Sequence, residues 1–476
     1  MKNILYLTLI SLFLSCNDGF EEINTNPNAP VNVQPEFLLR QVLYNYGEQM
    51  SYEGFVAGNL LGQYFTAVDF NLFDRHSLLE PQFGGSPWPI FYKNLRDNQI
   101  LLDKARTEPA AKVYEGPALI IKAHIAAALT DIFGDVPYSE AFSGRSGVIT
   151  PKYDAQEDIY TGEGGIIDNL NKAIMAIDAY KGSIPLSGDI IFNGDLSKWK
   201  RWANSLKIKA LMRIHSKENV ASELQSIYNQ GLYISSANQN AVFSFTTGAP
   251  NNFRMATARV GDFNIYIMSE TMQEILEKYQ DPRAQTFFRP ASNTGQFKGL
   301  LNGPDASKTS ITVGNYSLAG TVFRENTGAL QANLMTSWET LFFLAEAAQR
   351  GYISADAKSL YESAVNQAFA YWKTPLPAEY LSTGKATWGI DGTDPIEQIC
   401  TQKWLANIIN GYEGWIDYKR TGYPELKNVA ASLNNNLIPV RMPYPPDEQA
   451  LNAEQYGKAA GSTNNNSVNA KLWWMP

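Results

Sequence analysis

Helical periodicity is the feature of this sequence that most restricts how the chain can fold. In four long segments, apolar residues recur every three or four positions, which places them on one face of a helix. These segments are 114–133, 195–215, 338–349 and 355–372. Further helices are expected near residues 36–50, 86–107, 157–180, 269–279 and 399–410, with short strands only at 242–246 and 311–313. The pattern predicts a mainly all-α protein.

Some of the predicted helices form pairs joined by a short turn. In the pair 338–349 and 355–372, the pattern of small and aromatic residues resembles a tetratricopeptide helix pair, although no strict period of about 34 residues runs through the chain. Long irregular stretches separate the helices, at 66–86, 139–156, 181–194, 232–268, 285–334, 374–397 and 424–470. No linker rich in Pro, Gly or Ser divides the chain. We therefore expect a single mature domain, residues 16–476, whose long loops carry function.

Residues 1–16, MKNILYLTLISLFLSC, have the layout of a secretory signal peptide that ends at a cysteine. Lys2 gives a positive start, and the apolar stretch behind it is too short to span a bilayer as a mature helix. We expect residues 1–15 to be removed as a signal peptide and Cys16 to be lipidated. The acidic residues Asp18, Glu21 and Glu22 would keep the following tether solvated. No other segment reaches 18 consecutive apolar residues, so the chain is predicted to be anchored to a membrane and not to span it.

The composition argues against several classes of function. A net charge of −8 without a run of Lys or Arg disfavours nucleic acid, because phosphate binding needs a basic patch. Two cysteines, Cys16 and Cys400, cannot build a zinc framework, and the three histidines are far apart with no HExxH motif. Phosphate-loop and GxSxG motifs do not occur. We expect no metal, no cofactor and no nucleic-acid partner.

Seven motifs and a terminal Trp pair follow one another along the chain. They are NTNPNAP (24–30), DIFGDVPYSEAF (131–142), FNGDLSKWKRWANSLKIKALMRI (192–214), YQDPRAQTFF (279–288), SWETLFFLAEAAQRG (337–351), QKWLANIINGYEGWIDYKRTGYP (402–424), IPVRMPYPPDEQALN (438–452) and Trp473-Trp474. With the N-terminal cysteine, this ordered set resembles the SusD/RagB family of outer-membrane nutrient-binding lipoproteins, in its SusD-like branch. The resemblance covers essentially the whole chain.

The resemblance implies both an architecture and a role. It implies an α-helical fold of tetratricopeptide-like pairs, carried by a lipoprotein on the surface side of the outer membrane. One side of the scaffold would pack on a SusC-type TonB-dependent transporter, and the loop side would hold a ligand between the two proteins. Family members are not enzymes. We therefore expect a protein that captures oligosaccharides and delivers them to the transporter.

Paired carboxylates raise the alternative of catalysis, since glycosidases use two of them. Glu339 and Glu346 lie seven residues apart on one helical face, and Asp131 and Asp135 flank a helix end. Both pairs fall within the family motifs, where they are expected to be structural. His124 lies on an apolar helix and is interpreted as a core histidine.

Two loops and one tryptophan are the predicted ligand contacts, because rings stack on sugar faces and polar groups bind hydroxyls. In loop 66–83 the candidates are Asp69, Phe70, Phe73, Arg75 and Phe83, with Asn71 and Asp74 as polar neighbours. In loop 247–266 they are Phe253, Phe263 and Tyr266, with Arg254 and Asp262. The tryptophan is Trp388, which no helical stripe explains.

Three rival functions stay open at this point. They are peptide capture, which some family members perform, a surface glycoside hydrolase, and a structural lid whose ligand contacts come from the transporter. The glycan is also undetermined. A neutral β-glucan would suit stacking rings, whereas an acidic polysaccharide would need Arg75 or Arg254 to face the site.

Overall fold

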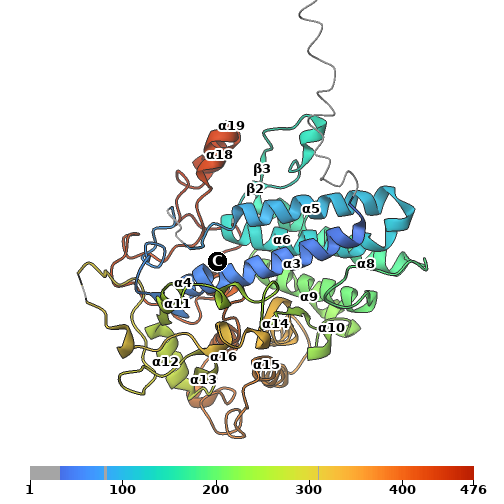
Figure 1. Ribbon diagram of the computed structural model, residues 1–476. Coiled ribbons are helices and arrows are strands. Elements are labelled where there is room, and N and C mark those ends of the chain that lie inside the picture. Colours follow the sequence, from blue (N-terminus) through green and yellow to red (C-terminus); the bar gives the residue numbers. More distant parts are fainter. Residues whose placement is uncertain (1–32, 80–82, 309) are drawn as a thin grey trace, which may run out of the picture.

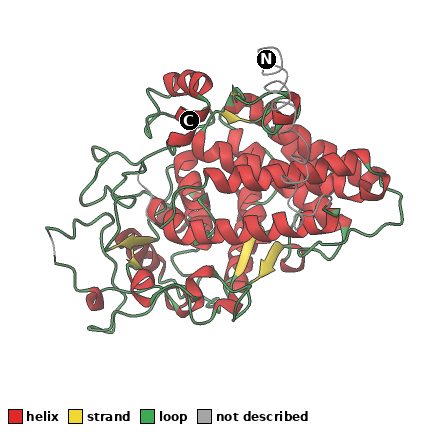
Figure 2. Cartoon of the chain, turned by 45° about the horizontal axis from the view of Figure 1, so that its top comes forward, coloured by secondary structure: helices red, strands yellow, loops and turns green. Residues whose placement is uncertain are grey.

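The computed structural model describes residues 33–79, 83–308 and 310–476 (Figure 1). The predicted signal peptide and Cys16 lie outside the described residues. The described chain is mostly helical, with three small sheets of two strands each (Figure 2). The predicted all-α class with helix pairs and long loops is confirmed.

Two groups of long helices form the body of the molecule. In the first group, α3 (Pro35–Glu53), α5 (Trp88–Thr107), α6 (Glu115–Phe133), α8 (Ile166–Ala179) and α9 (Leu196–Ile214) each pack on the next. In the second group, α14 (Ser337–Gln349) packs on α15 (Ala357–Tyr371) and α16 (Pro395–Ala406). Contacts between α9 and α14 join the two groups, so consecutive helix pairs share one core (Figures 1 and 2).

The shorter elements connect these helices. The remaining α-helices are α4 (Asn59–Leu61), α7 (Gln156–Thr161), α10 (Ala221–Gln230), α11 (Val260–Asn264), α12 (Glu270–Tyr279), α13 (Ala284–Phe287), α17 (Glu413–Thr421), α18 (Pro446–Leu451) and α19 (Ala453–Ser462). A π-helical turn, η1 (Gly54–Gly58), continues α3. The strands are β1 (Phe65–Ala67), β2 (Val136–Pro137), β3 (Tyr153–Asp154), β4 (Ala241–Ser244), β5 (Tyr266–Met268) and β6 (Gln331–Met335). They pair antiparallel as β1–β5, β2–β3 and β4–β6.

Local sequence chemistry sets several helix ends. The Asp195 carboxylate caps α9 by accepting from the backbone N–H of Ser197 at 2.9 Å, as an N-cap residue does. Asp394 caps α16 in the same way, and Pro395 occupies its first position. The helix predicted at 157–180 is broken into α7 and α8, because Gly162–Gly165 interrupts it and Asp168 accepts from the backbone N–H of Gly164 at 2.6 Å.

Two other local expectations differ from the structure. The predicted strand at 242–246 overlaps β4, which pairs with β6. The strand predicted at 311–313 is wrong, because residues 311 and 312 are irregular and a 3-10 turn begins at Val313. The stretch 424–470, expected to be irregular, contains α18 and α19. These two helices bury few side chains, so their sequence carries little apolar periodicity.

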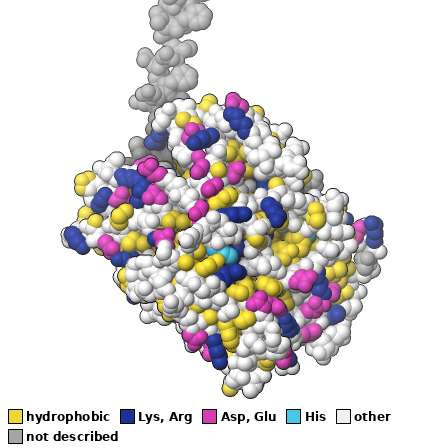
Figure 3. Space-filling view, turned by 180° about the vertical axis from the view of Figure 1, so that it is seen from behind, with side chains coloured by type: hydrophobic (Ala, Val, Ile, Leu, Met, Phe, Trp, Pro, Cys, Tyr) yellow, Lys and Arg dark blue, Asp and Glu magenta, His cyan; other side chains and the backbone are white. Residues whose placement is uncertain are grey.

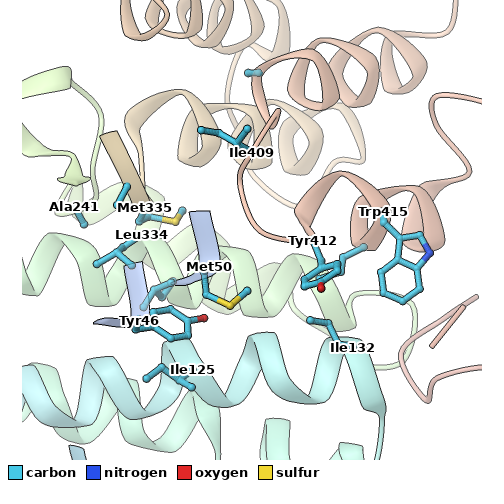
Figure 4. Close-up of a cluster of buried hydrophobic side chains, with 14 of the residues drawn as sticks. Tyr46, Met50, Ile125, Ile132, Ala241, Leu334, Met335, Ile409, Tyr412 and Trp415 are labelled. Atoms are coloured by element: carbon cyan, nitrogen blue, oxygen red, sulfur yellow. The ribbon is translucent and has the colours of Figure 1, made fainter. Parts of the chain in front are cut away.

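The apolar core joins segments that are distant in sequence. Figure 4 shows Tyr46 and Met50 of α3 lying between Ile125 and Ile132 of α6 on one side and the 409–412 segment and β6 on the other. One helical stretch, Pro109–Phe133, is apolar and long enough to cross a membrane, yet 78% of its most apolar window is buried within the fold. It is therefore a core element of this bundle.

A network of buried charges lies beside this apolar core. Its members are the cations Lys209, Arg213, Lys403, Lys419 and Arg420 and the carboxylates Asp131, Glu339, Glu346, Glu413 and Asp417, all buried. Lys209 Nζ lies 2.8 Å from Glu339 and 2.7 Å from Glu413. Arg213 Nε lies 2.9 Å from Asp131. The network thus ties α6, α9, α14, α16 and α17 together with matched numbers of opposite charges.

The carboxylates Glu339 and Glu346 face this network and not a cleft. Both oxygens of Glu346 accept from Arg420 at 2.6 Å, and Arg350 also donates to Glu346 at 2.9 Å. These guanidinium groups hold the pKa of Glu346 well below its usual range against the opposing effect of burial. Asp131 accepts from the Tyr160 hydroxyl at 2.6 Å.

Removing one carboxylate from the buried charge network should destabilise the fold. We expect Glu346→Ala to lower the free energy of unfolding by about 3–5 kcal/mol, because Arg420 loses the carboxylate that binds it through two bonds, and Asp417 alone is left to balance both Arg420 and Lys403. Urea unfolding followed by tryptophan fluorescence measures this change. Glu454→Ala is the control, because it breaks the exposed Lys458–Glu454 pair and should cost less than about 1 kcal/mol. Equal losses of unfolding free energy in the two variants would show that the buried network stabilises the fold no more than an exposed ion pair does.

His124 should make stability depend on pH. Its ring lies against Tyr46 and Trp202, and desolvation, with the nearby Lys209 charge, lowers its pKa from 6.5 to about 3. Because the unfolded chain takes up this proton first, stability is lost as pH falls from about 6.5 toward 3.

The size of this loss of stability follows from the proton that His124 binds in the unfolded chain and not in the folded one. Between pH 7.5 and pH 5, wild type should lose about 2 kcal/mol more of its free energy of unfolding than His124→Gln does. Urea unfolding at both pH values gives the difference. Parallel pH profiles for the two proteins would show that His124 is not held neutral.

Candidate functional site

The two predicted loops meet at one groove of about 280 Å³. Its walls come from α3 and η1, from the end of loop 66–83 and from residues 254–266. The lining residues are Tyr52, Val56, Phe83, Arg254, Met255, Thr257, Ala258, Asp262 and Tyr266. The structure therefore brings together two of the sequence-predicted contacts, Phe83 and Tyr266, and two of their predicted polar neighbours, Arg254 and Asp262.

A stacked pair of side chains forms one wall of this groove. The Arg254 guanidinium lies 4.3 Å from the centre of the Tyr52 ring. Arg254 also donates to both oxygens of Glu48, at 3.0 Å and 2.7 Å. The Tyr52 hydroxyl donates to the Phe83 carbonyl at 3.1 Å, which fixes the loop against the helix. The wall is a rigid platform in which the arginine charge is already compensated.

Two polar groups that border the groove have no partner among the described residues. Tyr266 is 2% exposed, so it offers the groove its hydroxyl and not a ring face. This hydroxyl makes no hydrogen bond with any residue that the structure describes, and the same holds for the Asp262 carboxylate. At the rim, Phe70 is 52% exposed and meets Phe83 edge to face at 5.2 Å between ring centres. Asp69 is also exposed, and it accepts from the backbone N–H of Phe70 at 2.8 Å. Rings with a few fixed polar groups are the usual make-up of a small-ligand site.

Polar residues in the middle of loop 66–83 hold the loop in place. Asp74 is buried and accepts from the Thr66 hydroxyl, the Asn302 amide and the backbone N–H groups of Ala67 and Gly303, at 2.7–3.1 Å. Burial raises the pKa of Asp74 to about 6 against these four bonds. Asn71 donates to the carbonyl oxygens of Ala67 and Pro304. These two residues do not face a ligand.

Arg75 and Trp388 lie away from the groove lining. Arg75 donates to the Ala431 carbonyl at 2.9 Å and lies 3.8 Å from Asp305. Trp388 is half-buried and packs on the Tyr361 ring, with 5.3 Å between ring centres. Neither side chain borders the same groove as Phe83 and Tyr266.

Three predicted aromatic contacts are core residues. Phe73, Phe253 and Phe263 are 3%, 0% and 1% exposed. Phe263 stacks on Phe55 with ring planes 9° apart, and Phe253 meets the same ring edge to face. Buried in this way, their rings have no face free for a sugar, and the prediction of direct contact is corrected to a packing role.

Sequence reasoning missed Tyr52 and Val56, because both lie between the helix expected near 36–50 and the candidate loop 66–83, where no ligand contact was predicted. The available signal was GFVAG, since a Gly pair within an apolar helix marks close backbone approach. Gly54 and Gly58 lie against the backbone of Ile409 and Gly411, where a Cβ would collide. The π-helical turn between them, a form frequent at functional sites, places Val56 on the groove.

Two larger grooves occur elsewhere. One of about 720 Å³ lies beside α12 and α16, and one of about 620 Å³ lies at the far ends of α5 and α8. Neither is lined by residues of the candidate loops 66–83 and 247–266. Within residues 33–79, 83–308 and 310–476, no group of three or more His, Cys, Asp or Glu side chains is arranged to hold a metal ion.

The fold and its groove define a binding protein built on tetratricopeptide-like helix pairs. Residues 27–445 match the SusD-like family model described as "Starch-binding associating with outer membrane". The chain belongs to this SusD-like family. A comparison with curated proteins gives no match.

Solved structures agree with this assignment. A SusD homologue from Bacteroides fragilis is 25% identical, covers 93% of this chain and 99% of its own, and superimposes with a TM-score of 0.80. A structure described as a chitin-binding protein has 23% identity, 93% and 100% coverage and a TM-score of 0.75. A chitin-binding SusD homologue from Flavobacterium johnsoniae has 23% identity, 92% and 97% coverage and a TM-score of 0.74.

Proposed function

We propose that this protein captures neutral oligosaccharides at the cell surface and delivers them to a SusC-type TonB-dependent transporter. In this proposal, residues 1–15 are removed, Cys16 carries the lipid that anchors the chain in the outer membrane, and residues 16–476 form the binding domain. The groove between Tyr52, Phe83 and Tyr266 carries the proposal, because it combines ring surfaces with unpaired polar groups. The starch- and chitin-binding descriptions of the family and of two relatives support a sugar as the ligand.

The groove suits a sugar by its shape and chemistry. The half-buried Phe83 ring offers a flat apolar face to the C–H side of a pyranose, and Phe70 extends this surface at the rim. Tyr52 lies beside it, with Arg254 stacked on one face of its ring. The Tyr266 hydroxyl and the Asp262 carboxylate supply a donor and acceptors for sugar hydroxyls. A volume of about 280 Å³ admits only part of a chain, so the remainder of an oligosaccharide would extend along the surface.

The charges around the groove favour a neutral ligand. Arg254 is neutralised by Glu48, and Arg75 is held by Asp305 and a backbone carbonyl. Asp262 then leaves the groove with an uncompensated negative charge. Among the residues that line the groove, no cation is left unpaired to balance a uronic acid beside this carboxylate, and like charges in a partly desolvated site repel.

The carboxylates near the groove also support binding without hydrolysis. A glycosidase needs two carboxyl groups on opposite sides of the scissile bond. Of the carboxylates near the groove, Glu48 is committed to Arg254 and Glu53 accepts from Gly85 and Tyr412. Of the residues that line the groove, Asp262 is the carboxylate left for a ligand, in the role of a hydrogen-bond acceptor, and Asp69 at the rim accepts from the backbone N–H of Phe70.

Ring truncation tests the groove. We expect calorimetry of the chain lacking residues 1–16, against starch, chitin and β-glucan oligosaccharides, to reveal a binder whose affinity falls about tenfold in Phe83→Ala or Tyr52→Ala, because one stacking face contributes about 1–1.5 kcal/mol. Phe142→Ala removes a ring that is 38% exposed but outside the groove, and it should leave the affinity unchanged.

The outcomes separate the rival functions. Binding of peptides in place of every sugar would favour peptide capture, and release of shortened sugars would establish a hydrolase. If no ligand binds until the transporter is added, the protein acts as a structural lid. Equal losses of affinity in the Phe83 and Phe142 variants would show that the sugar does not bind at this groove.

Charge specificity gives a second test. We expect Glu48→Gln to raise affinity for uronic-acid oligosaccharides by about 5–20-fold, because it frees the Arg254 charge at the edge of the groove. Affinity for the neutral ligand should change little. The same calorimetric titrations measure both ligands, and an unchanged preference would show that Arg254 does not set charge selectivity.

A further inference from the structure

One exposed face of α3 continues the wall of the sugar groove toward the start of the helix. The Arg254 guanidinium, which stacks on Tyr52, also binds Glu48 one turn earlier. Burial and the Glu48 charge raise the pKa of the Tyr44 hydroxyl, and Arg254 opposes them, so this hydroxyl lies close to both charges. Residues four apart lie on the same face of a helix. Tyr44, Glu48 and Tyr52 therefore form one line of side chains that leads out of the groove.

Side chains along this face are available to a ligand. Tyr44 and Asn45 are half-buried, and Phe37, two turns before Tyr44, is 57% exposed. Neither the Tyr44 hydroxyl nor the Asn45 amide makes a hydrogen bond with any residue that the structure describes. Figure 1 shows α3 crossing the front of the molecule, whereas the face seen from behind in Figure 3 carries charged side chains of both signs. A neutral chain lying on that rear face would remove water from charges that it cannot balance.

The Tyr44 ring is held in place before any ligand arrives. Phe243 of β4 packs against it, with 5.4 Å between ring centres and 32° between ring planes. A side chain that is already fixed loses less conformational entropy when it binds a ligand. Tyr44 and Tyr52 are eight residues apart, which corresponds to about 12 Å along the helix axis and exceeds the length of one sugar unit. A ligand that reaches both positions must therefore contain several sugar units.

The opposite rim of the groove offers fewer free polar groups. In the loop that follows Phe70, the side chains of Asn71, Asp74 and Arg75 all make hydrogen bonds within the protein. A sugar chain passing over this rim would meet the Phe70 ring but no unpaired amide beside it. The α3 side is thus the better route for the part of an oligosaccharide that the groove cannot hold.

We propose that the face of α3 around Tyr44 and Asn45 is a second sugar subsite, which makes the protein selective for linear neutral oligosaccharides of several units over mono- and disaccharides. The proposal rests on the sugar groove proposed above. One unit of the ligand binds in the groove at Phe83, and the chain then crosses the exposed side of Arg254. A later unit lies against the Tyr44 ring, while the Asn45 amide donates to and accepts from its hydroxyls.

The dependence of affinity on chain length tests the subsite. The probes are the disaccharide and the hexasaccharide of starch, chitin and β-glucan, titrated by calorimetry into the chain lacking residues 1–16. We expect the hexasaccharide of the bound glycan to bind about tenfold more tightly than its disaccharide, as one further stacking face would provide. Tyr44→Ala should remove most of this difference. Tyr44→Leu should do the same, because leucine keeps the apolar packing on Phe243 but has no flat ring.

A matched control separates stacking from general damage to the fold. Tyr228→Ala removes another half-buried tyrosine, which lies on α10 and packs on the Tyr233 ring. This variant should retain the full preference for the hexasaccharide. An equal loss of that preference in the Tyr228 and Tyr44 variants would overturn the subsite.

The other outcomes distinguish failure of the subsite from failure of the groove. Equal affinities of the wild type for the two chain lengths, or an unchanged preference in both Tyr44 variants, would overturn the subsite and leave the groove in place. Loss of the preference in Phe70→Ala but not in the Tyr44 variants would place the extended chain on the opposite rim. If no sugar of either length binds, the groove itself is not a sugar site, and the subsite fails with it.

Discussion

The buried charge network is the interaction on which the rest of the structure depends. An isolated buried charge costs several kcal/mol, so each of these ionic side chains requires its partner to be in place. Since the partners come from α6, α9, α14, α16 and α17, none of these helices can shift without exposing an unpaired charge to the core. The network thus adds geometric demands that apolar packing alone does not impose.

The ligand groove is connected to this network through a short chain of contacts. Glu413 belongs to the network, and its neighbour Tyr412 donates to Glu53 Oε2 at 2.5 Å. The same oxygen accepts from the backbone N–H of Gly85 at 2.8 Å, two residues after Phe83. Burial raises the pKa of Glu53, and these two bonds offset part of that desolvation. The position of a groove ring therefore depends on the ionic core behind it.

Helix α3 carries the ligand groove at its C-terminal end. It begins at Pro35, and its last turn contains Tyr52 of the groove. Its 19 residues correspond to about 28 Å at the usual rise of a helix. A helix of this length sets the distance between the ligand groove and Pro35, near the start of the described chain.

The sequence by itself determined the helical class, most helix positions and the family, because these depend on local periodicity, capping residues such as Asp195 and the order of motifs. It also located the two loops that meet at the groove. Only the tertiary structure decided which loop residues face outward. Phe253 and Phe263 lie in the core because Phe55, some 200 residues earlier in the chain, packs against them. Tyr52 lines the groove although the sequence offered no ligand contact in its segment. Burial of an aromatic ring depends on partners that are distant in sequence, and no local pattern records them.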